Sequence, residues 1–227
     1  MSPLPPGQQA LDHFPRFGIT ALARRFPKQP HRVQLALDGA LQSPLAIDEA
    51  AWARLPRHQQ TSDFHCVTTW SRQGLQWSGV RFRDVHAMLA ASHGLDAQAT
   101  LVVLRSQDGY HAALPLQDLL ADDVLLADRL DGAPLPVEHG APLRLVAPAH
   151  YGYKNVKHLK RIEFRRPGDG YRPFGWRFMS HERARVALEE RGTGLPGWLL
   201  RRLYRPLIGP TVRAFERAMR EYTAAPR

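Results

Sequence analysis

The chain of 227 residues has a single cysteine, Cys66. One cysteine cannot form an internal disulfide or a four-cysteine metal cluster, and the lack of disulfides is typical of a reducing compartment. The sequence also lacks a Cys-x-x-Cys-His haem attachment site, an iron–sulfur cysteine set and a glycine-rich dinucleotide fingerprint. No His-Glu-x-x-His pair occurs among the 11 histidines, which disfavours a zinc enzyme.

Long apolar runs are absent as well. No run reaches the roughly 20 residues needed to cross a bilayer, and the first seven residues lack the charged-then-apolar order of a secretory signal. Arg24 and Arg25 precede Phe-Pro-Lys-Gln-Pro, which is not an export signal. We therefore expect a cytoplasmic location.

Acidic residues are in the minority, with 21 Asp and Glu against 31 Lys and Arg and a net charge of +10. This excess favours anionic partners: nucleic acid, a phosphate-bearing cofactor, an acidic protein or a lipid surface. Aromatic side chains do not interleave with the basic ones as in a stacking platform, so no nucleic-acid partner is expected. A hydrophobic content of 44% is enough for one substantial core, alone or with an extension.

Apolar periodicity predicts both strands and helices. Alternation over 33–37 indicates a half-buried strand, and Asp48 is placed to cap a short helix that carries Trp52. A strand over 61–69 would contain Cys66, and the spacing from Val80 to Leu89 predicts an amphipathic helix that ends at Gly94. Further strands are expected at 101–104, 110–114, 124–128, 143–146 and 160–164.

The composition changes after Gly170. Residues 180–191, 195–204 and 210–222 have helical apolar spacing with arginine on the opposite faces. The segment is too short to bury much surface by itself. We expect an α+β chain that ends in a basic helical extension over 171–227.

Cys66 has two interpretations. It could be a small buried hydrophobe in a strand, or the soft ligand of a thiophilic metal. Phe64, Cys66 and Thr68 alternate with the intervening residues, and a polar Trp-Ser-Arg segment follows. A polar strand end beside a thiol favours the wall of a site.

Two blocks carry a resemblance to a known family. Residues 63–71, Asp-Phe-His-Cys-Val-Thr-Thr-Trp-Ser, followed by 77–82, resemble the cysteine loop of the sulfite oxidase-like molybdopterin oxidoreductases. Residues 140–148 and 151–157 resemble the segment that holds the cofactor in the same family. The match covers about 14–164 and is closer to the haem-free bacterial branch, which includes the methionine-sulfoxide reductase subunit, than to animal sulfite oxidase. Animal enzymes usually follow the cysteine with Ala-Gly-Asn-Arg-Arg, whereas this chain has Val-Thr-Thr-Trp-Ser at residues 67–71.

The resemblance implies a mixed-sheet sulfite oxidase-type molybdopterin-binding domain over 1–170 that holds a Mo-molybdopterin cofactor. Its phosphate needs cations, its ring needs hydrogen-bonding edges and its metal needs a protein ligand. Cys66 would supply sulfur to molybdenum, and Arg144 would meet the phosphate with its planar fork. A solvated surface charge is the alternative for Arg144 and Lys157. The implied cofactor contacts are His13, Phe14, Ser106, His139, Arg144, Asn155, Val156 and Lys157.

The implied reaction is two-electron oxygen-atom transfer at the metal, to or from a small sulfoxide, sulfite or N-oxide. Cys66, His65, Arg72 and Tyr151 are the candidate catalytic residues, with His65 and Arg72 as hydrogen-bond donors to the substrate oxygen. Electrons would be exchanged with a separate protein, for which a membrane haem protein is one candidate. The basic extension could dock that protein, lie on a membrane surface, or pack on the enzyme's own core. The alternative function is a non-catalytic cofactor-binding or adaptor protein.

Overall fold

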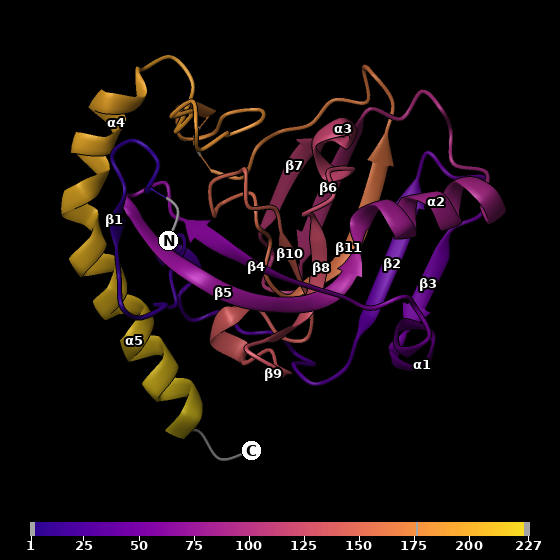
Figure 1. Cartoon of the computed structure of the whole chain (residues 1–227), viewed down its shortest axis with the longest axis horizontal. Helices are drawn as coiled ribbons and strands as arrows, with labels where there is room; N and C mark the ends of the chain where they lie inside the picture. The colour runs from indigo at the N-terminus through magenta and orange to yellow at the C-terminus, as the bar shows by residue number, and fades with distance from the viewer. Residues whose placement is uncertain (1–2, 176, 225–227) are drawn as a thin grey trace.

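This computed structural model describes residues 3–175 and 177–224, which form two β-sheets with helices around them (Figure 1). Strand β5 runs through the first sheet and pairs with β1, β4 and β8, and β8 in turn pairs with β9 and β10. The first sheet consists of β1 (Gln9–Ala10), β4 (His58–His65), β5 (Trp70–Arg81), β8 (Leu125–Leu130), β9 (Ala133–Pro134) and β10 (Arg144–Val146).

The second sheet is mixed, because β11 is parallel to β2 and antiparallel to β6. Its order is β3 (Leu45–Asp48), β2 (Gln34–Gly39), β11 (Leu159–Arg165), β6 (Leu101–Ser106) and β7 (His111–Pro115). The main core joins side chains of both sheets, with Leu37, Val80 and Ile162 fully buried. Burial of such side chains is the dominant favourable term in folding.

The helices are α1 (Glu49–Ala53), α2 (Phe82–Ser92), α3 (Leu116–Leu119), α4 (Gly197–Tyr204) and α5 (Ile208–Ala224), with 3-10 turns at Thr20–Leu22, Val137–His139, Arg177–Met179 and Arg205–Leu207. The predicted cap of α1 is present, since the Asp48 carboxylate accepts a hydrogen bond from the Ala51 amide at 2.8 Å. The predicted α+β class is confirmed by these sheets and helices. In the part of the chain that the structure describes, no helix has the length and apolar character to span a bilayer.

The strand that the sequence predicts over 61–69 ends four residues early, at His65. Cys66 to Thr69 form a tight turn instead, in which the Cys66 amide donates to the Trp70 carbonyl at 2.8 Å and Thr69 adopts φ +87°. This turn lets β5 return antiparallel to β4, so Cys66 lies at the end of a hairpin rather than inside a strand.

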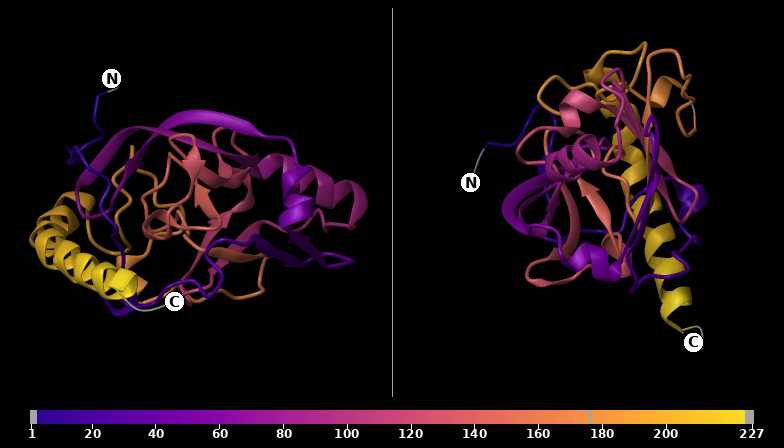
Figure 2. Two further views of the ribbon diagram at one scale, coloured as in Figure 1. Left: turned by 90° about the horizontal axis from the view of Figure 1, so that it is seen from below. Right: turned by 90° about the vertical axis from the view of Figure 1, so that its right-hand side faces the viewer.

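The extension is partly helical. Helices α4 and α5 occupy the segments where the sequence predicts them, and they run along one edge of the molecule beside β1 (Figures 1 and 2). The helix predicted over 180–191 is absent. The backbone there pairs with a distant loop, since Tyr151 donates to the Ala184 carbonyl and Val186 donates to the Ala149 carbonyl, each at 2.9 Å. These bonds compete with the helical pattern that the sequence suggests.

Candidate functional site

Cys66 lies on the wall of a cavity. Its side chain is 7% exposed, its Sγ atom is 3.1 Å from the Thr68 hydroxyl, and the cavity that it lines has a volume of about 430 Å³. Burial raises the pKa of the Cys66 thiol to about 11. A volume of this size is within the range of cofactor and ligand sites. The sulfur therefore faces a space in which another molecule can meet it.

Distant parts of the chain build this cavity. The N-terminal segment contributes Arg16 to Leu22, the Cys66 turn and the β6–β7 hairpin contribute further walls, and the loop before β11 closes one side. The extension also takes part through Tyr204, Leu207, Thr211 and Phe215. The cavity thus lies between the sheet domain and the helices that follow it.

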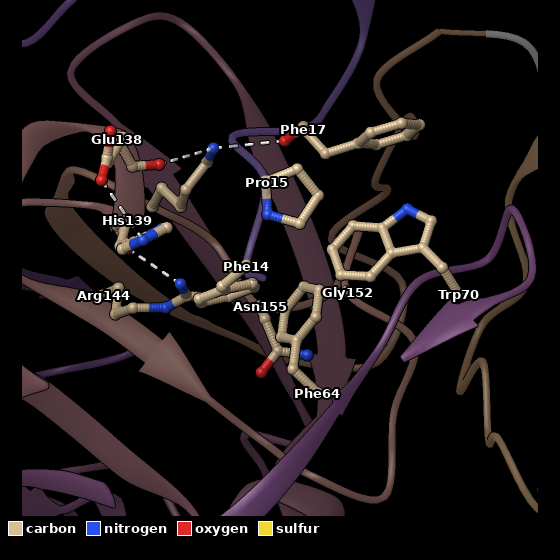
Figure 3. A pocket seen from close by; sticks show the side chains of 11 residues that line it. Phe14, Pro15, Phe17, Phe64, Trp70, Glu138, His139, Arg144, Gly152 and Asn155 are labelled. Carbon is tan, nitrogen blue, oxygen red and sulfur yellow. Dashed lines mark hydrogen bonds and ion pairs between the residues drawn. The ribbon is translucent and has the colours of Figure 1, made fainter. Parts of the chain in front are cut away.

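A second, smaller cavity of about 40 Å³ adjoins the first (Figure 3). Arg144, His139 and Phe14 line it, and the His139 ring stacks on Phe14 with 4.4 Å between centroids. The two cavities share the walls Phe17, Phe64, Trp70, Gly152, Asn155 and Lys157. Cys66 and Arg144 therefore face neighbouring spaces separated by a few common side chains.

Arg144 is a buried cation whose hydrogen bonds within the described residues go to carbonyls, with the Trp77 ring 4.9 Å from its guanidinium carbon. Its side chain is 1% exposed, and it donates from Nη1 to the His139 carbonyl at 2.8 Å and from Nε to the Leu145 carbonyl at 3.3 Å. Burial lowers its pKa to about 9. The pKa of His139 falls to about 3, through burial and then through the charges of Arg144 and Lys157. This histidine is consequently neutral at pH 7.

Lys157 lines both cavities. Its Nζ donates to the Phe17 carbonyl at 3.2 Å and lies 3.5 Å from the Glu138 carbonyl. Burial, and then the charges of Arg144 and Arg16, lower its pKa to about 7. A lysine titrating near neutral pH gains a proton readily when an anion arrives.

Two further cations line the large cavity. Arg16 donates to the Ala23 carbonyl at 2.8 Å, and its Nε has no hydrogen-bond partner among the described residues. Burial lowers its pKa to about 10. Lys154 is buried and donates to the carbonyls of Ala113 at 2.6 Å and Glu182 at 2.7 Å. Its pKa falls to about 8, mainly through burial.

These four cations fit an anionic cofactor. Within 3–175 and 177–224, no carboxylate lies at ion-pairing distance from Arg16, Arg144, Lys154 or Lys157. Burying an unpaired charge costs free energy, and a bound anion offsets that cost. With the Cys66 thiol on the same wall, the donor set suits a phosphate-bearing group that also needs a sulfur ligand for its metal.

The sequence-predicted contacts differ in their placement. Phe14, His139, Arg144, Asn155 and Lys157 come together around the two cavities. Asn155 also shapes the loop, because its Oδ1 accepts from the Ala147 amide at 2.6 Å. Three others do not line either cavity: His13 is exposed, Ser106 is buried beside the Asp108 turn, and Val156 belongs to the apolar core.

The predicted catalytic residues other than Cys66 also lie outside the cavity linings. His65 turns away to the Ser71 hydroxyl, 2.7 Å from its Nδ1, because it is paired with Ser71 across the β4–β5 hairpin. Arg72 donates to the Gln73 carbonyl at 3.1 Å, and Tyr151 is fully buried beneath the Arg191 guanidinium. The large cavity that Cys66 lines is also lined by Thr68, Trp70, Tyr110 and His111, of which Thr68 contacts the sulfur.

Sequence reasoning missed Arg16 and gave Lys154 little weight. Arg16 stands two residues beyond Phe14, in a run where the family places its first cofactor contacts, so its position was a usable signal. For Lys154 the sequence left open which lysine of Lys-Asn-Val-Lys is exposed. The structure buries the side chain of Lys154 and leaves that of Lys157 half-buried at the cavity wall.

Comparison with known proteins gives a consistent result. Residues 23–170 match the family described as "Oxidoreductase molybdopterin binding domain". The chain is 34% identical over 161 residues to the "Uncharacterized oxidoreductase YuiH" of Bacillus subtilis, covering 71% of this chain and 78% of that protein. It is 27% identical to the "Protein-methionine-sulfoxide reductase catalytic subunit MsrP" of Campylobacter jejuni, covering 63% of this chain and 52% of that protein.

The fold agrees with a solved structure, the sulfane dehydrogenase SoxCD from Paracoccus pantotrophus, with a TM-score of 0.52 and 24% identity. That match covers 61% of this chain and 39% of the other, so this chain spans well under the full length of several relatives. The family match also ends at residue 170, before the extension. On the strength of the matched domain and the cysteine and cation geometry, the chain belongs to the family of molybdopterin-binding oxidoreductases, molybdenum-dependent enzymes with a sulfite oxidase-type fold.

Proposed function

We propose that the chain catalyses two-electron oxygen-atom transfer to or from a small substrate of the sulfoxide, sulfite or N-oxide type. One observation carries this proposal: the Cys66 sulfur lies on a cavity wall that it shares with buried cations lacking carboxylate partners. When bound, the molybdenum cofactor supplies the two-electron chemistry and the site for the transferred oxygen.

The residues of the chain have distinct roles in this proposal. Cys66 would ligate the metal, and Arg144 and Lys157 would hold the cofactor phosphate through charge-assisted hydrogen bonds. Arg16 and Lys154 add positive charge to the wall of the large cavity. Arg16, Arg144 and Lys154 are buried, which strengthens their charge interactions.

His111 is the group in the large cavity best suited to move a proton. It is half-buried, its Nδ1 is 3.2 Å from the Tyr171 hydroxyl, and burial lowers its pKa, as do the charges of Arg105 and Arg165. The neutral ring at pH 7 can accept a proton. The phenol of Tyr110 donates to the Tyr153 carbonyl at 2.5 Å, so that hydroxyl is already engaged.

Electrons would be exchanged with a separate electron-transfer protein. The relatives include a "catalytic subunit MsrP" and a "subunit YedZ1", names that describe parts of larger assemblies. We propose a membrane haem protein as the class of partner, and a cytoplasmic location for this chain. Cell fractionation and turnover with isolated membranes test these two points.

The function is tested by measuring molybdenum and pterin in the purified protein and then screening sulfoxides, N-oxides and sulfite with a redox dye. We expect about one molybdenum per chain, one substrate class with clear turnover, and loss of both in Cys66→Ser because the metal loses its protein sulfur. Thr68→Val is the matched control, since it removes the hydroxyl beside the sulfur and leaves the thiol.

Full turnover in the Cys66→Ser variant would contradict the proposal. Stoichiometric molybdenum without turnover of any of these substrates would favour the alternative, a non-catalytic cofactor-binding or adaptor protein.

A further inference from the structure

The extension contributes a buried arginine to the turn that carries Cys66. The Arg191 side chain is 0% exposed, and its Nη1 donates to the Val67 carbonyl at 2.6 Å while Nη2 donates to the Pro6 carbonyl at 3.1 Å. Its guanidinium carbon lies 4.9 Å from the Tyr151 ring centroid. One side chain thus joins the Cys66 turn, the N-terminal segment and the loop before β11.

The Cys66 turn needs such support. Thr69 has φ +87°, a conformation that costs about 1 kcal/mol or more for a β-branched residue and persists only when its surroundings hold it. Three carbonyls of the turn are held from outside: Cys66 by the Gln8 side chain at 3.1 Å, Thr69 by the Gln9 amide at 2.9 Å, and Val67 by Arg191. Of these three donors, Arg191 is the charged one.

The charge of Arg191 is only partly neutralised. Its nearest carboxylate oxygen, Glu189 Oε1, is 3.4 Å away and is shared with Arg201 at 3.3 Å. The two terminal nitrogens of Arg191 are held at shorter distances by the Val67 and Pro6 carbonyls.

We propose that Arg191 is a positioning residue for the metal ligand: by holding the Val67 carbonyl, it fixes the turn from which the Cys66 sulfur meets the cofactor. The inference rests on the proposed function in taking Cys66 as the ligand of molybdenum. Arg191 lies beyond residue 170, outside the matched family domain. The extension is thus part of the site.

The first test uses the cofactor-free protein. Amide hydrogen exchange of residues 66–69 is compared in wild type, Arg191→Met, Arg191→Lys and the control Arg201→Met, which removes the other partner of Glu189 without touching the turn. Loss of a charged hydrogen bond predicts about tenfold faster exchange in Arg191→Met. Arg191→Lys keeps the positive charge but not the two guanidinium nitrogens that donate to Val67 and Pro6, so its exchange rate should be intermediate. The exchange rate of Arg201→Met should match that of wild type.

The second test uses the molybdenum-loaded protein and records the absorption band from thiolate sulfur to metal. The wavelength of this band should shift in Arg191→Met and Arg191→Lys and should not change in Arg201→Met. Unchanged exchange and an unchanged band in the Arg191 variants would overturn the proposal, and Arg191→Lys decides alone if Arg191→Met fails to fold. If Arg191→Met exchanges faster but the wild-type protein takes up no molybdenum, the positioning of the turn is supported and the proposed function is refuted.

Discussion

Buried and half-buried arginines have opposite surroundings in two regions of this molecule. Around the cavities, Arg16 and Arg144 donate only to backbone carbonyls. In the extension, Arg183 donates to the Asp118 carboxylate at 2.8 Å and Arg185 to the Glu190 carboxylate at 3.0 Å. The pKa shifts follow: burial lowers the pKa of Arg16 and Arg144, and hydrogen-bonded carboxylates raise the pKa of Arg183 and Arg185.

The difference separates cations that serve the fold from cations that serve a ligand. A paired arginine has its charge compensated once the chain is folded. Arg16 and Arg144 have carbonyl oxygens and aromatic rings around their guanidinium groups, so part of the burial cost is left for a bound anion to offset. The cavity cations are therefore the proposed binding site of an anion. Arg191 lies between these classes, because it belongs to the extension yet contacts the Cys66 turn.

The largest effect is expected where the two regions meet. Phe215 is 3% exposed, its ring lies 5.0 Å from the Arg16 guanidinium carbon, and it lines the large cavity from α5. Phe215→Ala should lower the free energy of unfolding by about 3–4 kcal/mol, as for other buried phenylalanines. Urea denaturation measures this change, and Leu207→Ala, at a cavity residue that is 48% exposed, should cost well under half as much.

Equal costs for Phe215→Ala and Leu207→Ala would show that the extension adds little to the folded domain. Two separate unfolding transitions would also break the comparison, because they would make the extension an independent unit rather than a wall of the site.

The second prediction contrasts an arginine at the cavity with a carboxylate-paired arginine in the extension. Arg144→Met should leave the stability of the cofactor-free protein within about 1 kcal/mol of wild type. The substitution removes the cost of a buried charge that has no carboxylate partner, and it also removes two carbonyl contacts and the contacts with aromatic rings. Cofactor affinity should fall by roughly 10- to 100-fold through loss of a charge-assisted contact. Molybdenum content after dialysis measures the affinity, and thermal unfolding measures the stability.

Arg185→Met is the matched control, because it breaks a carboxylate pair away from the cavities. It should destabilise the cofactor-free protein slightly and leave molybdenum content unchanged. The distinction between the two kinds of cation fails if Arg144→Met destabilises the cofactor-free protein more than Arg185→Met does and retains molybdenum.

Part of this arrangement could be predicted from the sequence because it is local. Alternating apolar residues predicted β2, and a continuous apolar run over 101–104 predicted the buried β6. The two family blocks predicted the neighbourhood of Cys66, Arg144 and Lys157. These features depend on residues a few positions apart. The matched family domain confirms the fold class and cofactor that the same blocks implied.

The remainder depends on contacts between distant segments. Strand β5 was missed because its first half, Trp-Ser-Arg-Gln-Gly, is polar and its pairing partners β4 and β8 decide its extended form. The segment 180–191 has helical spacing, yet it bonds to the loop at 149–151. The hydrogen bond from Arg191 to Val67 could not be predicted from the sequence, because the two residues are 124 positions apart.

The smallest predicted effect is a pH dependence that the cofactor should remove. The pKa of Lys157 is about 7 in the folded chain, below its ordinary value of 10.5, so the unfolded chain binds more protons between these pH values. Stability of the cofactor-free protein should therefore rise from pH 7 to 9, by up to about 1 kcal/mol per pH unit. Lys154 and Arg144, with their lowered pKa values, add to the rise. Cys66, with its pKa raised to about 11, opposes part of it toward pH 9, because its thiol ionises first in the unfolded chain.

Lys157→Met removes one of these groups and should flatten the rise measured by thermal unfolding at pH 7, 8 and 9. A bound phosphate raises the pKa of Lys157 again, since an anion favours the ammonium form. The molybdenum-loaded protein should accordingly show little gain over this range. An equally steep rise in stability with and without cofactor would mean that the cofactor phosphate does not reach Lys157. Lys157 would then not be one of the cations that bind the cofactor.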